Sequence, residues 1–93
     1  MIVGVLQVEL SIPGSFSLKD KRHVVKGLLE RLRRDFAVSA AEVDRHDIWN
    51  SALLGVAFVS NDARHAESHL RRVLNAVERS RDAVVEDAQI EVF

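Results

Sequence analysis

The hydrophobic pattern of the chain changes its period several times within 93 residues. Apolar residues first alternate with polar ones, as in a half-buried strand, and then recur on one face of a helix. The Ser17 hydroxyl with Asp20 three residues later is typical of a helix N-cap. The predicted elements are, in chain order, strand Ile2–Ile12, helix Leu18–Asp35, strand Ala37–Asp44, strand Leu53–Ser60, a helix that is capped by Asn61 or Asp62 and ends at about Ser80, and strand Val84–Phe93.

This order predicts an α+β protein with a split β-α-β arrangement, known as the ferredoxin-like fold. We expect a β-α-β-β-α-β sandwich in which a four-stranded antiparallel sheet carries both helices on one face, as a single domain over residues 1–93. The two halves resemble each other. Gly4 and Val5 match Gly55 and Val56 at an offset of 51 residues, whereas the apolar helix positions match at an offset of 45.

The composition narrows the class of protein. Cysteine is absent, which excludes disulfides and thiolate zinc sites and fits a reducing compartment. Gln7 and Glu9 interrupt the apolar start, and no basic leader precedes it, so we expect neither a signal peptide nor a membrane span. The sequence therefore predicts a cytoplasmic protein without a membrane partner.

One face of the predicted sheet is left uncovered. If the even residues of the first strand face the helices, its odd residues face away, and the repeat places part of the third strand beside them. A large exposed apolar patch usually marks an interface. We expect a dimer or partner surface here, with base stacking by the third strand as the weaker alternative, and its residues are Val3, Val5, Leu54, Val56 and Phe58.

Positive and negative residues are concentrated in different segments of the chain, although the net charge is only −1. Residues 19–34 and 64–81 carry twelve Lys and Arg against four acids, whereas the remainder carries Arg45 against ten acids. Phosphates would be repelled by an acidic sheet and attracted to basic helices. The candidate nucleic-acid or anion-binding residues are therefore Lys19, Lys21, Arg22, Lys26, Arg33, Arg64, Arg71 and Arg72.

The first helix contains two further signals. Its start, Ser17 to His23, places cations beside the free N–H groups of a helix N-terminus, unless Asp20 already caps them. Gly27 lies on the exposed side, where glycine costs about 1 kcal/mol relative to alanine, which suggests close approach of a partner. The alternative is an ordinary solvated face with ion pairs four residues apart.

Catalytic and metal sites have weak support. His65 and His69, with Asp62 one turn earlier, lack a third committed ligand. The polar cluster near Glu42 and Asp44, which strand alternation would place on one face, has no nucleophile beside it. We expect no catalytic residues, no metal and no cofactor.

Several segments resemble the YlxP-like family of small bacterial proteins. The most specific is Ser17-Leu18-Lys19-Asp20-Lys21-Arg22, and the others are Val3-Gly4-Val5, Ala41-Glu42-Val43-Asp44, Asp47-Ile48-Trp49 and Val59-Ser60-Asn61-Asp62. The resemblance implies a ferredoxin-like fold and a cytoplasmic bacterial protein of unknown biochemical function. Genes of the family tend to lie among translation genes, which favours contact with RNA or ribosomes by association only.

Two hypotheses about function follow. The first is a non-enzymatic module that binds structured RNA or a ribosomal particle through phosphate contacts on the basic helices, without DNA sequence readout. The second is a homodimeric protein-interaction or small-ligand-sensing domain packed through the open sheet face. The sequence favours the first because its charge is concentrated on the helices.

Overall fold

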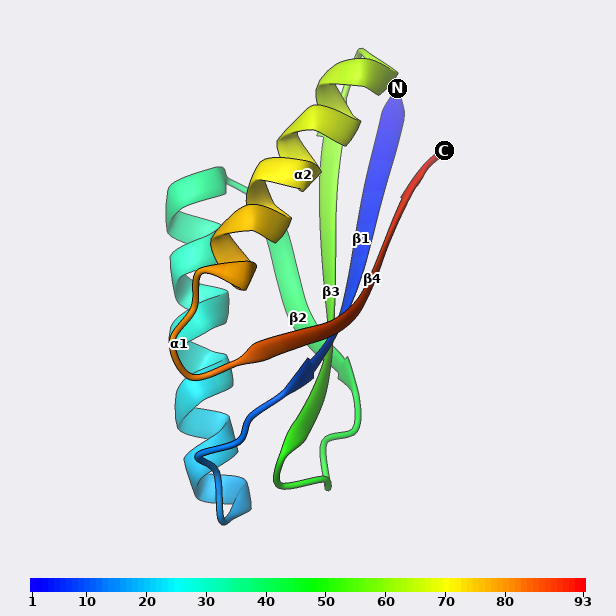
Figure 1. The fold of residues 1–93 in the computed structure, drawn as a ribbon. Coiled ribbons are helices and arrows are strands. Elements are labelled where there is room, and N and C mark those ends of the chain that lie inside the picture. Colours follow the sequence, from blue (N-terminus) through cyan, green and yellow to red (C-terminus); the bar gives the residue numbers. More distant parts are fainter.

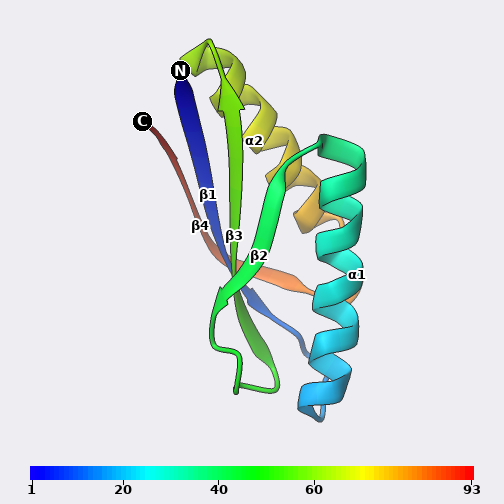
Figure 2. The same ribbon diagram turned by 180° about the vertical axis from the view of Figure 1, so that it is seen from behind.

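The computed structural model describes all residues, Met1–Phe93. The sheet is antiparallel, with strand order β2-β3-β1-β4, and both helices lie on one face of it, which confirms the predicted ferredoxin-like fold (Figure 1). Figure 2 shows the opposite face of the sheet without a covering element. The elements are β1 (Ile2–Ser11), α1 (Leu18–Phe36), β2 (Ser39–Asp44), β3 (Ser51–Ser60), α2 (Ala63–Glu78) and β4 (Val84–Val92).

Local signals in the sequence set the helix ends. At the start of α1, the Ser17 hydroxyl accepts a hydrogen bond from the Asp20 N–H at 3.1 Å, and the Asp20 carboxylate accepts one from the Phe16 N–H at 3.0 Å. Asp62 caps α2 by accepting from the Arg64 N–H at 2.9 Å. Both caps agree with the predicted helix starts and satisfy N–H groups that the helices leave free.

The core lies between the helices and the sheet. The even residues of β1, including Leu6, Val8 and Leu10, are buried against apolar residues of both helices, as the alternation predicts. At Gly4 the helix α2 comes so close that a Cβ atom would lie 2.8 Å from Cδ1 of Leu70. Glycine at this position therefore lets α2 pack directly on β1.

The predicted orientation of β3 is wrong. In the antiparallel register Leu6 pairs with Val56, so the two share the helix-facing side of the sheet. Leu54 and Val56 are buried in the core, and the ring of Phe58 stacks on His69 of α2 with centroids 4.1 Å apart. The offset of 51 caused the error because an odd offset matches residues that point to opposite faces of a sheet.

Candidate functional site

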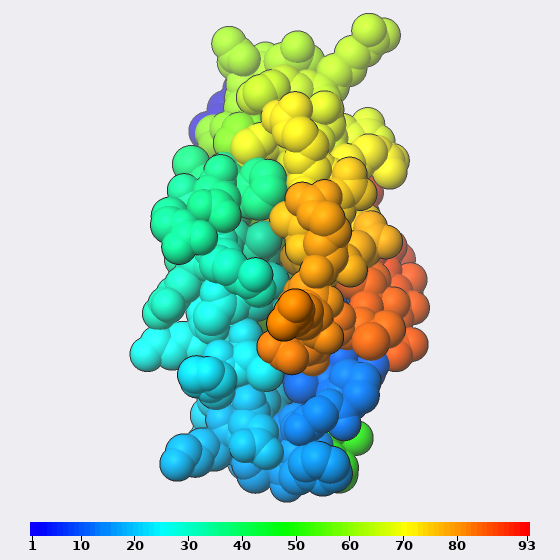
Figure 3. Space-filling view, turned by 60° about the vertical axis from the view of Figure 1, so that its left-hand side comes forward, coloured from blue at the N-terminus to red at the C-terminus, as the bar shows by residue number.

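The helix layer brings together most of the basic residues that the sequence singles out. In the space-filling view of Figure 3, α1 and α2 lie side by side, and the segment that follows α2 continues beyond its end next to α1. Several cations on these elements are exposed and make no ion pair or side-chain hydrogen bond, which leaves their full charge available to a ligand. They are Lys19, Arg22, Lys26, Arg31, Arg64, Arg79 and Arg81.

Lys21 is not part of this surface, and the prediction that it binds an anion is wrong. Its side chain is fully buried, and Nζ donates to the Glu42 carboxylate at 2.9 Å. Nζ also lies 2.7 Å from the carbonyl oxygen of Arg45, 3.2 Å from that of Ser51 and 3.4 Å from that of His46. Lys21 therefore fixes the connection between β2 and β3 onto the start of α1.

Three other predicted binding residues already have partners within the chain. The guanidinium of Arg33 donates to the carbonyl oxygen of Ala40 in β2. Arg71 pairs with Glu67 at 2.9 Å, and Arg72 lies 3.2 Å from Nδ1 of His69. These contacts reduce what the three arginines can offer a ligand, although they remain exposed.

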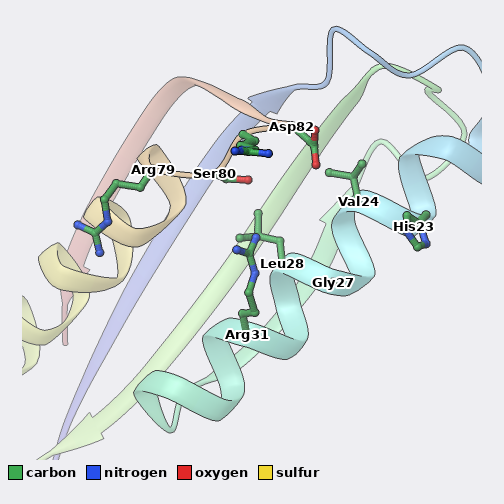
Figure 4. Close-up of a pocket in the computed structure, with 9 residues that line it drawn as sticks. His23, Val24, Gly27, Leu28, Arg31, Arg79, Ser80 and Asp82 are labelled. Carbon is green, nitrogen blue, oxygen red and sulfur yellow. The ribbon is translucent and has the colours of Figure 1, made fainter.

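The largest hollow of the helix layer lies between α1 and the segment that follows α2. It has a volume of about 570 Å³ and is partly open to solvent. Figure 4 shows Arg31 extending from α1 toward the opposite wall, where Ser80 and Asp82 lie. We call this hollow the interhelical groove, and its lining residues are His23, Val24, Gly27, Leu28, Arg31, Arg79, Ser80, Arg81 and Asp82.

Three arginines make the interhelical groove cationic. Arg31, Arg79 and Arg81 have no ion-pair partner, and Asp82 is the single carboxylate of the lining. A second hollow shares Leu28, Arg31 and Arg79 with the groove and continues it along α1 as far as Phe36. The second hollow also includes the Asp35 carboxylate, whose pKa is lowered by the hydrogen bond from Arg34 and by the nearby charge of Arg31.

Sequence reasoning found Gly27 but missed the arginines around it. Gly27 lies in the lining of the groove, and a Cβ atom there would have no other atom within 4 Å. Arg79 and Arg81 lie at and beyond the end of α2, where helical periodicity no longer predicts direction. The spacing of residues along the chain does not predict that these two arginines lie near Gly27. The only signal in the sequence was that two basic residues, Arg79 and Arg81, lie within three positions of each other.

A shallower hollow lies on the other flank of α1. Arg22, Lys26 and Arg33 line it together with Glu42. Glu42 is paired with Lys21, and Arg33 donates to Ala40, so Arg22 and Lys26 are the free cations of this flank. This flank of α1 therefore offers fewer free charges than the interhelical groove.

The histidines of α2 have structural contacts. His69 Nε2 lies 2.7 Å from the carbonyl oxygen of Phe36, and its Nδ1 faces Arg72, so both ring nitrogens are engaged. No group of three possible metal ligands converges anywhere in the structure. Strict alternation would place Glu42 and Asp44 on one face of β2. The pairing of β2 with β3 is irregular between these two residues, so the strand does not alternate strictly there.

The uncovered sheet face carries an apolar patch, but its residues in β3 differ from those predicted. Val3 and Val5 lie on it, and they pair with Val59 and Ala57 of β3. The residues of β3 predicted for this face, Leu54, Val56 and Phe58, lie on the helix-facing side instead. The side chain of Val43 folds over Gly55, where a Cβ atom would lie 2.9 Å from it. The ion pair between Glu9 and Arg45, at 2.8 Å, lies toward one end of this face.

The element order and sheet topology define a ferredoxin-like α+β domain, and comparison with solved structures agrees. A de novo designed protein with a ferredoxin fold, solved by solution NMR, matches all of this chain and 84% of its own with a TM-score of 0.59 at 13% identity. Neither helix is long and apolar enough to cross a membrane.

Sequence comparison places the chain in a family. Residues 3–90 match the family described as "Protein of unknown function (DUF503)", and the chain belongs to this family. The uncharacterized protein YlxP of Bacillus subtilis (strain 168) is 37% identical over 73 residues, which cover 78% of this chain and 79% of the relative. These matches agree with the resemblance to YlxP-like proteins seen in the sequence.

Proposed function

We propose that this protein is a non-enzymatic RNA-binding module of the cytoplasm that attaches to structured RNA or a ribosomal particle through its helix layer. The observation that carries the proposal is the interhelical groove, in which Arg31, Arg79 and Arg81 surround one hollow without an ion-pair partner. Arginine suits this role because its planar guanidinium binds phosphate oxygens through two parallel hydrogen bonds.

The distribution of charge favours approach from this side. The acidic residues are concentrated outside the helices, so the protein presents a positive layer to a polyanion and a more negative sheet edge away from it. Long-range attraction of this kind raises the rate of association and weakens with added salt. Contacts that reach only phosphates orient the ligand without reading its bases.

The groove contains residues of catalytic type, but their arrangement favours binding over catalysis. His23, Ser80 and Asp82 all line it, yet no hydrogen bond joins any two of them. A serine nucleophile needs a base within hydrogen-bonding reach, and that base needs an orienting partner. We therefore assign the groove a binding role.

The direct test is cosedimentation with purified ribosomal subunits at low and moderate salt. We expect the wild-type protein to bind in a salt-sensitive manner. We expect the triple variant Arg31→Gln, Arg79→Gln, Arg81→Gln to lose most of this binding while keeping its fold by circular dichroism, because these side chains make no contact that the fold needs.

A matched variant removes the same charge from arginines that already have partners. Arg34, Arg71 and Arg72 are exposed on the helices, and the hydrogen bond from Arg34 lowers the pKa of the Asp35 carboxyl. The triple change of these arginines to Gln should weaken binding much less than the groove variant. Equal loss in both variants would show nonspecific charge attraction, and the absence of wild-type binding would refute the proposal.

A second candidate is a homodimer packed through the uncovered sheet face. The observation that favours it is a shallow apolar hollow on that face, lined in part by Val5, Ala41, Val43 and Ala57. The variant Ala57→Asp would then be monomeric in sedimentation velocity at a concentration where the wild type is dimeric. Asn75→Asp adds the same charge to α2 and serves as its control. A monomeric wild type contradicts this candidate.

A further inference from the structure

Gly27 is unusual for its position. It lies in the interior of α1, where glycine is the least favourable residue after proline. Its backbone has ordinary helical geometry, since the structure contains no glycine with a positive φ angle. A Cβ atom at Gly27 would meet nothing within 4 Å, unlike one at Gly4, which would collide with Leu70. The fold of this chain therefore gives no steric reason for a glycine at position 27.

The surroundings of Gly27 supply a reason outside the chain. The residue lies in the lining of the interhelical groove, which Arg31, Arg79 and Arg81 make cationic. The groove and its continuation extend along α1 from His23 to Phe36, a rise of about 20 Å at 1.5 Å per residue. An open depression of this length suits a chain-like anion better than a small molecule, which binds in an enclosed pocket.

We propose that one strand of an RNA sugar–phosphate backbone lies in the interhelical groove, in direct contact with the α1 backbone at Gly27. Its phosphates lie against the guanidinium groups of Arg31, Arg79 and Arg81. This inference rests on the proposed function and adds to it the point of closest contact and the part of the RNA that makes it.

The carboxylate of Asp82 adds a means of selecting RNA. It lines the same groove as the three arginines but forms no ion pair with any of them. A carboxylate beside phosphates lowers affinity unless it accepts a hydrogen bond from the ligand. The ribose 2′-hydroxyl is a donor that RNA has and DNA lacks. We therefore place a ribose hydroxyl at Asp82.

The test compares Gly27→Ala and Gly27→Leu with the wild-type protein. Gly27→Ala should raise Tm by roughly 4 to 8 °C, because alanine favours the helix and its methyl group enters open space. The same change should weaken binding to oligouridine about threefold, and Gly27→Leu should weaken it at least tenfold. A more stable protein that binds less well is a result that a purely structural role for Gly27 does not produce.

The control is Asn75→Ala, which improves helix propensity at an exposed position of α2 outside the groove. It should stabilise the protein without changing RNA affinity. Gly27→Leu could bind oligouridine as tightly as the wild type while the triple variant Arg31→Gln, Arg79→Gln, Arg81→Gln does not. That result would refute the close contact at Gly27 and leave the proposed function standing. If the wild type binds neither oligouridine nor ribosomal subunits, both fail.

The role of Asp82 is tested by the ratio of affinities for oligouridine and oligodeoxyuridine. Asp82→Asn should raise DNA affinity, because it removes repulsion, and should reduce the preference for RNA at least threefold. An equal rise in affinity for both polymers would show that Asp82 only repels phosphates, and it would overturn the assignment of the ribose hydroxyl.

Discussion

Two cationic regions of this small domain use positive charge in opposite ways. At the start of α1, the Lys21 ammonium group is fully buried and lies against the Glu42 carboxylate and three backbone carbonyl oxygens. In the interhelical groove, Arg31 and Arg79 form no ion pair. The first charge holds the β2–β3 connection onto the start of α1, whereas the second pair remains available to a ligand.

The comparison shows that the number of basic residues in a segment does not measure its capacity to bind anions. Lys21 and Arg22 are neighbours in the sequence, yet one is buried and the other is exposed. A buried ammonium group loses its hydration and must be paired and hydrogen-bonded, so it has nothing left to offer a ligand. Variants that separate stability from affinity test this distinction directly.

The largest expected effect is on stability, from Lys21→Met. This change leaves the Glu42 carboxylate, which is itself mostly buried, without its partner and leaves carbonyl oxygens unsatisfied. We expect the free energy of unfolding to fall by about 3 to 5 kcal/mol, as measured by urea denaturation. Lys19→Met, on the exposed side of the same helix turn, should change it by less than about 0.5 kcal/mol.

A double variant sharpens this result. Combining Lys21→Met with Glu42→Gln removes the uncompensated buried charge, so the double variant should be more stable than Lys21→Met alone. If Glu42→Gln brings no recovery, the ion pair is not the reason for the loss of stability.

The next effect is on affinity, from the pair Arg31→Gln and Arg79→Gln. Each phosphate contact contributes roughly one unit to the slope of the logarithm of affinity against the logarithm of salt concentration. The double variant should therefore reduce that slope by about two units and weaken RNA binding about tenfold, measured by fluorescence anisotropy. An unchanged slope would show that these two arginines do not contact phosphates.

Arg33→Ala should give an intermediate result that affects stability more than binding. The Arg33 guanidinium donates to the carbonyl oxygen of Ala40 and so links α1 to β2. Loss of this link should lower the free energy of unfolding by about 1 kcal/mol in thermal or urea denaturation. RNA affinity should fall less than for Arg31→Gln. The opposite order would return Arg33 to the binding surface.

The smallest effect is expected from Lys26→Gln on the β2 flank of α1. Lys26 is exposed and makes no ion pair, so the free energy of unfolding should change by less than about 0.5 kcal/mol. Its contribution to RNA binding should be a change of less than one unit in the salt slope. A larger change than that of Arg31→Gln alone would move the main contact from the interhelical groove to this flank.

Much of the fold was predictable because its signals are local. The alternation in β1, the apolar faces of the helices and the cap at Ser17 each depend on residues within one element. The orientation of β3 was predicted wrongly because it depends on register with β1. The bulky residues Leu54, Val56 and Phe58, set against Gly55 and Ala57, were a usable signal for the buried face.

The candidate site was predicted in part. The charge of the helices and the oddity of Gly27 were visible in the sequence, but the fate of each cation was not. Arg79 and Arg81 line the same hollow as Gly27 only because the end of α2 and the segment after it lie beside α1. The partners of Lys21 are between 21 and 30 residues away along the chain.

The sequence by itself determined the order of the strands and helices, the faces that α1, α2 and β1 bury, and the concentration of positive charge on the helices. These properties follow from periodicity and composition, which are carried by neighbouring residues. Only the tertiary structure decided which side of β3 is buried, which cations are used by the fold, and where the free arginines form a groove. Those outcomes depend on strand register and on contacts between distant segments, and such contacts leave no local pattern in the chain.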